Sequence, residues 1–331
     1  MQKEHEQRYP KSSTLKPVKS RLVEGKILPP TSLELIVSDH CNIACRQCNH
    51  ASPVIRKWNI DPDEVRTDLS TLAKVYRPAK LKLIGGEPLL HPRLEDVILA
   101  ARASNISDYL HLVTNGLLLN RMTDGAWRAL DEIEISGYPN SGVGDKIIAE
   151  ARKKGWKFNT KVTLTVFSDF RYTFSKYPIE DTDLVRKIFA GCKIANHWGC
   201  HAIYKGHIYR CPQSIYAPTL AGKEFSDGLK LETSPDFQET LLNFLNEDAP
   251  LQSCSNCVGT NGKKIRHELL KRKAWADDLE TPPEEMIDYE LLEKSLIEYA
   301  DIDDCRNVTK PRRFSMIYFR NKIQNLRRAT R

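Results

Sequence analysis

The chain has 331 residues, of which 40% are hydrophobic, enough to bury the core of one catalytic domain plus a smaller appendage. The lack of any run near the roughly 18 apolar residues of a membrane span and a polar, basic start argue against membrane and exported proteins, and the formal net charge is +7. Nine cysteines in such a chain predict reduced, metal-binding thiols in a cytoplasmic protein rather than disulfides.

Strand-like and helix-like runs alternate along the first two thirds of the chain. Residues 1–31 lack hydrophobic periodicity and end at two prolines, so we expect an arm there. The later alternation predicts β-α units with a parallel sheet and crossovers of one hand. A sixth strand is expected within residues 203–209. The other expected strands are 33–38, 81–85, 109–114, 132–136 and 161–167, and the expected helices are 62–76, 93–104, 124–131 and 144–155.

Three cysteines follow the first expected strand. Cys41, Cys45 and Cys48 are separated by three and two residues, and thiolates at this spacing can hold three corners of a four-iron, four-sulfur (4Fe-4S) cluster. The fourth iron then has no protein ligand. A structural zinc site would need a fourth ligand close by, and none is near in the sequence. The loop therefore resembles the cysteine loop of radical S-adenosylmethionine (radical SAM) enzymes.

This resemblance implies a fold, two cofactors and a reaction. The fold is an α/β, partial (β/α)6 TIM-like barrel with its working loops beyond the carboxyl ends of the strands. The cofactors are the 4Fe-4S cluster and S-adenosyl-L-methionine (SAM), which binds the open iron. The reaction is reductive cleavage of SAM to a 5′-deoxyadenosyl radical, which abstracts hydrogen from a substrate. A reducing partner such as flavodoxin or ferredoxin is expected with it.

A Gly-Gly-Glu-Pro segment follows the second expected strand. Its two glycines let the backbone turn sharply and approach a ligand, although an ordinary turn could have the same composition. Beside the cysteine loop it resembles the family's segment that binds the SAM amino group. The SAM-binding residues predicted here are Gly85, Gly86, Glu87 and Pro88.

Polar residues also follow the third and fourth expected strands. Thr114 and Asn115 follow the third and Ser136 follows the fourth, where side chains can reach the ribose and carboxylate of SAM. Asn115 and Ser136 are predicted to contact SAM, with turn formation as the alternative because Asn-Gly and Ser-Gly are common turn formers. Gln47 departs from the family pattern, which has an aromatic residue there near the adenine. Position alone suggests four substrate-facing residues: Tyr138, Asn140, Arg171 and Tyr172.

A second group of cysteines lies beyond the expected barrel. Cys254 and Cys257 form a closely spaced pair, and Cys211 lies on an expected hairpin. Together with Cys192 they resemble the Twitch subdomain, the shortened form of the SPASM domain, in which four cysteines hold an auxiliary 4Fe-4S cluster. The resemblance implies the ligands Cys192, Cys211, Cys254 and Cys257, with Cys200 as a rival ligand. A zinc ribbon is the alternative for these thiolates.

If Cys200 is not a ligand, it is a candidate hydrogen-atom donor, which would convert an abstraction into an epimerisation. A small buried side chain without a chemical role is the alternative. Cys305 has no nearby partner and is expected to be an ordinary thiol. Three histidines of this segment are expected at polar positions of an exposed hairpin, with cluster or substrate contact as the alternative: His197, His201 and His207.

The C-terminal end is strongly basic. Residues 306–331 contain nine Lys or Arg residues and no acidic residue. We expect a solvated tail, with binding of an anionic partner as the alternative. Its apolar positions could form a helical stripe: Phe314, Ile317, Tyr318, Ile323 and Leu326.

The predicted organisation has four parts: an N-terminal basic arm (1–31), the barrel (32–190), a small cysteine-rich Twitch/SPASM-like subdomain (191–262) and a helical, basic C-terminal extension (263–331). The expected function is oxidation or epimerisation of a small polar substrate, carbohydrate or aminocyclitol-like. Radical SAM modification of a ribosomally made peptide is one alternative. A non-catalytic, metal-binding, nucleic-acid-associated protein is another.

Overall fold

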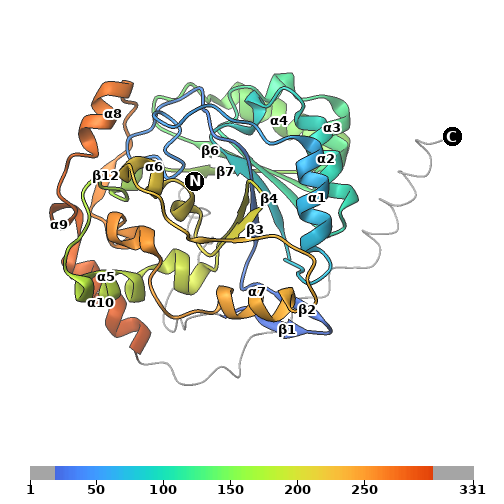
Figure 1. Cartoon of the computed structure of the whole chain (residues 1–331). Coiled ribbons are helices and arrows are strands. Elements are labelled where there is room, and N and C mark those ends of the chain that lie inside the picture. The colour runs from blue at the N-terminus through green and yellow to red at the C-terminus, as the bar shows by residue number, and fades with distance from the viewer. Residues whose placement is uncertain (1–18, 301–331) are drawn as a thin grey trace. The chain divides into compact units, whose positions relative to one another are not determined.

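A computed structural model describes residues 19–300 of the chain (Figure 1). The first 18 residues of the predicted arm, Cys305 and the basic tail lie outside the described residues. The three boundaries between the four predicted parts stay predictions. None of the helices described combines the length and the apolar character needed to cross a membrane.

Twelve strands and ten α-helices are described between residues 19 and 300. The strands are β1 (Arg21–Val23), β2 (Lys26–Leu28), β3 (Leu33–Ser38), β4 (Leu81–Gly85), β5 (Leu110–Thr114), β6 (Glu132–Gly137), β7 (Lys161–Val166), β8 (Asp169–Arg171), β9 (His201–Tyr204), β10 (His207–Tyr209), β11 (Gly228–Lys230) and β12 (Lys264–Arg266). The helices are α1 (Pro62–Leu72), α2 (Leu94–Ala103), α3 (Asp124–Ala129), α4 (Asp145–Phe158), α5 (Thr182–Gly191), α6 (Ala217–Ala221), α7 (Phe237–Leu245), α8 (Arg272–Asp278), α9 (Pro283–Met286) and α10 (Tyr289–Ala300).

The centre of the fold is an eight-stranded sheet in the order β11-β10-β9-β3-β4-β5-β6-β7. Strands β3 to β7 are parallel neighbours in chain order, which confirms the predicted β-α units. Helices α1 to α4 follow them and cover one side of the sheet (Figure 1). Within the described residues β7 and β11 remain the two ends of the sheet, so it is a partial barrel and not a closed one.

The sixth parallel strand lies next to the first. Strand β9 pairs in parallel with β3, opposite the side on which β4 lies, and the predicted hairpin continues from it into β10. The hairpin turns at Lys205 and Gly206, both with positive φ, as a tight two-residue connection requires. This arrangement attaches the segment with the second group of cysteines directly to the edge of the barrel sheet.

The strands of the barrel alternate apolar and polar side chains. In β4, Leu81 and Leu83 belong to the main core with the helices, whereas Lys82 and Ile84 line a cavity on the other face of the sheet. Helix α1 begins with a capping box at Asp61 and buries an apolar stripe against this core. The inner face of the sheet is therefore left for polar side chains and ligands.

A short hairpin precedes the barrel. The sequence analysis predicts no element within residues 19–31, and this is wrong, because β1 and β2 pair there. The strands are three residues long and bury only Ile27, whose amide donates to Val75 O at 2.7 Å. So short an element with one buried side chain shows no periodicity in the sequence.

The C-terminal segment returns to the barrel. Strand β12 pairs antiparallel with β8, and helix α8 follows it beside the loop after β3. A second core cluster joins Ile36 of β3, Phe174, Tyr216 and Trp275 of α8. Helices α5 and α10 form a third cluster. Residues 263–300 contain strand β12 and helices α8, α9 and α10, and a separate C-terminal extension stays a prediction.

Candidate active site

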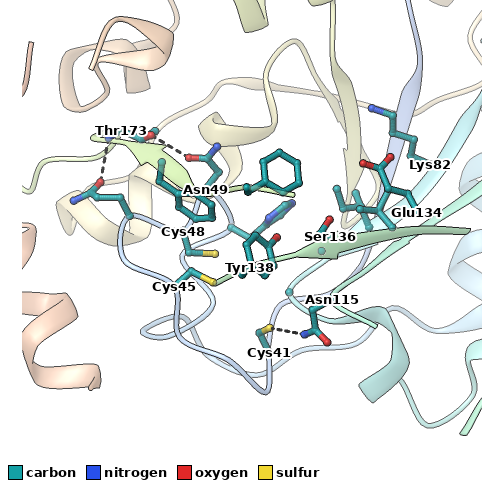
Figure 2. A pocket seen from close by; sticks show the side chains of 18 of the residues that line it. Cys41, Cys45, Cys48, Asn49, Lys82, Asn115, Glu134, Ser136, Tyr138 and Thr173 are labelled. Carbon is teal, nitrogen blue, oxygen red and sulfur yellow. Dashed lines mark hydrogen bonds between the residues drawn. The ribbon is translucent and has the colours of Figure 1, made fainter. Parts of the chain in front are cut away.

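A cavity of about 770 Å³ opens at the carboxyl ends of β3 to β6 and continues down the inner face of the sheet. Its volume suits a cofactor together with a small substrate. All three cysteines of the first loop line it, and Figure 2 shows them on one side of the cavity. Seven of the predicted cluster- and SAM-binding residues line it: Cys41, Cys45, Cys48, Gly85, Gly86, Asn115 and Ser136.

The three cysteines are free thiols in a poorly solvated place. Burial raises the pKa of Cys41 to about 12 and also raises the pKa of Cys45 and Cys48, and the neighbouring thiols add to the shift for Cys41 and Cys45. Thiolates here therefore need a cation to balance them, as iron in a cluster does. The residues present fit a cluster held by three cysteines.

There is no room for a side chain at Gly85 or at Gly86. A Cβ on Gly85 would overlap Ser38 O, and one on Gly86 would overlap His40 O and lie 2.8 Å from Ser52 Oγ. The backbone of the segment instead bonds the start of the cysteine loop, because the Gly86 amide donates to Ser38 O at 2.6 Å. The glycines thus let the cysteine loop lie directly against the end of β4.

Glu87 and Pro88 lie buried beside the cavity but do not line it. The Glu87 carboxylate accepts hydrogen bonds from Thr114 Oγ1 (2.6 Å), Asn115 N (2.8 Å) and Leu89 N (2.9 Å). Burial raises the pKa of Glu87, and these hydrogen bonds lower it by less. In this structure the side chain ties the end of β4 to the end of β5.

Asn115 links the cysteine loop to β5. Its Nδ2 donates to Asn42 Oδ1 at 2.7 Å and lies 3.7 Å from Cys41 Sγ (Figure 2). A donor next to this sulfur stabilises negative charge on it. Ser136 is 5% exposed and belongs to the inner face of β6.

Aromatic side chains form the wall of the cavity beyond β6. Tyr138 stacks on His267, with ring centroids 4.9 Å apart, and on Phe167 at 5.8 Å. Phe170 meets Tyr138 edge to face. Tyr138, Phe167 and Phe170 all line the cavity. They supply flat apolar surface of the kind on which a purine or a substrate ring packs.

Gln47 occupies the position at which the family pattern has an aromatic residue, and in this structure its side chain anchors the cysteine loop. It is 1% exposed, and its Oε1 accepts from Thr173 N (3.1 Å) and Phe174 N (3.2 Å). Its Nε2 donates to Asp278 Oδ2 at 2.8 Å. An aromatic ring could make none of these bonds, so the cysteine loop is anchored here by polar contacts.

Helix α8 and the residues before it clamp the cysteine loop. Asp278 Oδ1 accepts from Arg46 Nε at 3.0 Å and Nη2 at 2.6 Å. Trp275 Nε1 donates to Cys45 O at 2.8 Å, and Leu270 N donates to Ala44 O. These contacts join positions more than 220 residues apart.

The four cysteines assigned to the auxiliary cluster lie together. Burial is the largest cause that raises the pKa of Cys211, and the thiols of Cys192, Cys257 and Cys254 raise it further. Burial and Cys192 raise the pKa of Cys254 to about 12. Gly259, with φ +55°, leaves its amide 3.3 Å from Cys257 Sγ, and a Cβ there would come within 2.7 Å of Cys192 Sγ. Among the described residues, no three or more His, Cys, Asp and Glu side chains are arranged to hold a single metal ion.

Cys200 lies apart from this group, just before β9. Burial, then Glu34 and Cys192, raise its pKa to about 12, while Lys82 opposes the shift. It is not among the residues that line the cavity. Both its roles, rival ligand and hydrogen-atom donor, stay predictions.

The histidine prediction is wrong for two of three residues. His197 and His201 are 4% and 3% exposed, because they lie where the hairpin segment packs on the barrel. His201 Nδ1 is 2.9 Å from Tyr76 Oη, and burial lowers the pKa of His201 to about 3. Of the residues suggested by position, Tyr138 and Arg171 line the cavity; Tyr172 bonds Arg46, and Asn140 is exposed in a turn.

The sequence analysis missed the charged residues of the cavity. Lys82, His111 and Glu134 line it from β4, β5 and β6. A signal was present, since polar residues alternate with apolar ones in these three strands. Reading that alternation as an inner polar face would have found them.

Comparisons with known proteins agree with this site. Residues 35–144 match the family described as the radical SAM superfamily. The chain is 30% identical over 105 residues to GTP 3′,8-cyclase of Chlorobaculum tepidum, covering 31% of this chain and 32% of that protein. It is 29% identical over 125 residues to PqqA peptide cyclase of Streptomyces rochei, covering 37% and 34%. The chain thus matches about a third of the length of these curated relatives.

Among solved structures, the chain is similar to BtrN in complex with AdoMet and 2-DOIA, with 13% identity, a TM-score of 0.40, and coverage of 84% of this chain and 94% of that one. The family match does not support the alternative of a non-catalytic protein. Residues 35–144, which carry the three-cysteine loop and the first parallel strands of the sheet, thus match the radical SAM superfamily, whereas the rest of the chain lies outside this match.

Proposed function

We propose that Cys41, Cys45 and Cys48 hold the 4Fe-4S cluster and that SAM binds beside it, against Gly85, Gly86, Asn115 and Ser136. The observation that carries this assignment is that these side chains and backbone segments, from the ends of four neighbouring strands, line one cavity. Glu87 and Pro88 support the site from buried positions beside the cavity. Bound together, the cluster and SAM supply a 5′-deoxyadenosyl radical for removing hydrogen from a C–H bond.

The protein's own part is to hold the loop and to keep water away. Asn115 places an amide donor by Cys41, and Gln47 and Asp278 fix the backbone between Cys45 and Cys48. The stacked wall of Tyr138, Phe167 and Phe170 offers an apolar surface to a reactive carbon.

We propose a small, polar, uncharged substrate, carbohydrate or cyclitol-like, which is oxidised or epimerised. Each cation lining the cavity has a carboxylate beside it: Lys80 is 3.3 Å from Glu132, Lys82 is 3.5 Å from Glu34, and Arg171 is 3.7 Å from Asp288. A nucleoside triphosphate, as in the name of the GTP cyclase, would need cations that are not already neutralised. Hydroxyl groups need only local donors and acceptors.

Peptide modification is the second candidate, supported by the likeness to PqqA peptide cyclase. A peptide substrate would reach the same cavity with one side chain. The two candidates differ in what must be added for turnover. A polyol should be consumed without a precursor peptide, whereas the second candidate requires one.

We propose that Cys192, Cys211, Cys254 and Cys257 hold an auxiliary 4Fe-4S cluster. The thiols of Cys192, Cys257 and Cys254 all raise the pKa of Cys211, whereas Cys192 is the one cysteine that raises the pKa of Cys200. C200A should therefore retain the full iron content, and C211A should lose about half of about eight iron atoms per chain. Zinc in place of the second cluster would overturn this part. A cytoplasmic location and a flavodoxin or ferredoxin reductant belong to the same proposal.

The function is tested with anaerobically reconstituted protein, SAM and a strong reductant. The wild type should release methionine and 5′-deoxyadenosine, and C45A should release neither. As a matched control, C200A should still cleave SAM. Full iron loading without any SAM cleavage would refute the assignment.

A further inference from the structure

Four polar side chains cross the inner face of the sheet below the cysteine loop. Glu34 of β3 pairs in register with Lys82 of β4, and Lys82 pairs with His111 of β5. Glu134 of β6 lies on the same face and comes 3.3 Å from His111. We call these four residues the inner polar row. Figure 2 shows Lys82 and Glu134 together, across the cavity from the cysteines.

His111 is the member whose bonding is incomplete. It is 3% exposed, and neither ring nitrogen makes a hydrogen bond within the described structure. Its Nε2 faces Glu134 Oε2 at 3.3 Å as a long ion-pair contact. Buried imidazole nitrogens are normally hydrogen-bonded, and this one lines a cavity large enough for a ligand. His111 therefore has unused hydrogen-bonding capacity at the wall of the cavity.

Lys82 adds donors at the same level. Its ammonium carries three N–H groups, and Glu34 Oε1, 3.5 Å away, is the partner of one of them. Burial opposes its charge, but Glu34 and then Cys200 and Glu134 raise the pKa of Lys82, so it stays an ammonium. Its side chain is 27% exposed, and that exposed part faces the cavity.

We propose that Lys82, His111 and Glu134 form the site that recognises the substrate, through adjacent hydroxyl groups of a small polyhydroxylated ring. Lys82 donates to one hydroxyl oxygen. His111 bonds a second hydroxyl through its imidazole ring, and Glu134, with Oε2 3.3 Å from Nε2, lies beside the ring and adds an acceptor. The site rests on the proposed function, since its ligand is the substrate of the radical reaction.

The position of the row fits this role. Figure 2 shows Ser136 between the cysteines and the pair Lys82 and Glu134, so a ring held by the row lies on the far side of Ser136 from the cysteine loop. Its ring carbons then face toward the SAM site, while its hydroxyl groups face the row. Recognition and reaction are thereby assigned to opposite sides of one substrate.

The test uses the reconstituted holoenzyme with SAM and without reductant, and measures binding by anaerobic titration calorimetry and saturation-transfer NMR. The probes are myo-inositol and trans-1,2-cyclohexanediol, with cyclohexanol as the ligand lacking the second hydroxyl. The variants are H111F and K82M. The matched control is K157M, which removes an exposed lysine that pairs with Asp124 and does not line the cavity.

The wild type should bind both polyols and prefer them to cyclohexanol. H111F and K82M should each lose at least about tenfold in polyol affinity, and K157M should stay within about twofold. Unchanged affinity in H111F and K82M, an equal loss in K157M, or no polyol binding by the wild type would each overturn the inference. Circular dichroism and SAM affinity monitor folding; if H111F alone misfolds, K82M decides.

SAM cleavage with reductant separates this inference from the proposed function. If the wild type releases 5′-deoxyadenosine but substitutions in the inner polar row do not change polyol binding, the proposed function stands and the recognition site is refuted. If the wild type releases no 5′-deoxyadenosine, the proposed function itself is refuted.

Discussion

Replacing Asp278 by alanine should loosen the cysteine loop from a distance of more than 220 residues in sequence. The change removes two hydrogen bonds from Arg46 and one from Gln47, and it leaves the guanidinium with Tyr172 Oη at 2.7 Å and the more distant Glu268 as its remaining acceptors. The side chains of Arg46 and Asp278 are 25% and 10% exposed, so solvent compensates only in part.

Breaking a buried pair by removing one partner costs about 3–5 kcal/mol, and the partial exposure of Arg46 lowers our expectation for D278A to about 3 kcal/mol. With an unfolding entropy of about 2.1 cal/mol/K per residue, this corresponds to a decrease in Tm of about 4 °C. D278N keeps one acceptor oxygen and should lose about half as much. Because the loop carries Cys45 and Cys48, D278A should also lose iron faster to a chelator.

The assay is thermal unfolding by circular dichroism together with the rate of iron loss to a chelator under anaerobic conditions. The matched control is E280A, two residues further along, which removes an exposed pair with Lys176 and should leave both readouts unchanged. Wild-type iron retention in a folded D278A variant would refute the clamp, even if its Tm fell.

Three further changes test other contacts of the site. G86A should lower SAM affinity at least about tenfold, since the added Cβ overlaps His40 O at an overpacking cost of about 1–3 kcal/mol, whereas G144A, which meets nothing within 4 Å, should not; calorimetry with SAM decides. E87Q should cost about 1–3 kcal/mol in urea unfolding, because an NH₂ group then faces a backbone amide of Asn115 or Leu89; wild-type stability would contradict this. Burial opposes ionisation of Glu132, but His111 and Lys80 lower the pKa of Glu132 to about 2. The ionised side chain therefore stabilises the fold above the unfolded pKa of 4.5, and this stabilisation is lost as the pH falls from 4.5 to 2. E132Q should flatten this part of the pH–stability curve by about 2 kcal/mol, and an unchanged slope would exclude the pKa shift.

The parallel strands and the position of the cysteine loop were predictable from the sequence. Apolar residues at every second position marked β4, β5 and β6, and the carboxyl ends of such strands lie at one edge of a sheet. The placement of β9 beside β3 was not predictable, because strand order in a sheet is set by packing and leaves no local pattern. The contact of Arg46 with Asp278 is hidden for the same reason.

The roles of individual polar residues were harder to predict than the elements that carry them. Glu87 reads as a ligand residue beside two glycines, but three donors from β5 and its own turn occupy its carboxylate. His201 reads as a surface residue until Tyr76 is found beside it. In both cases the partner lies on a neighbouring element, and only the fold brings the two together.

Thr173 joins the two groups of cysteines, and this bears on how the clusters are counted. Its amide donates to Gln47 Oε1, next to Cys48, and its carbonyl accepts from Val258 N at 2.9 Å, next to Cys257. A change at Cys257 therefore strains the backbone that also anchors the first loop, whereas Cys211 lies on another element, after β10. Iron lost from a Cys257 variant can come from either cluster, since the contacts that hold one loop also hold the other. The Cys211 variant removes a ligand without touching Thr173, so it is the one whose iron content reports the auxiliary site alone.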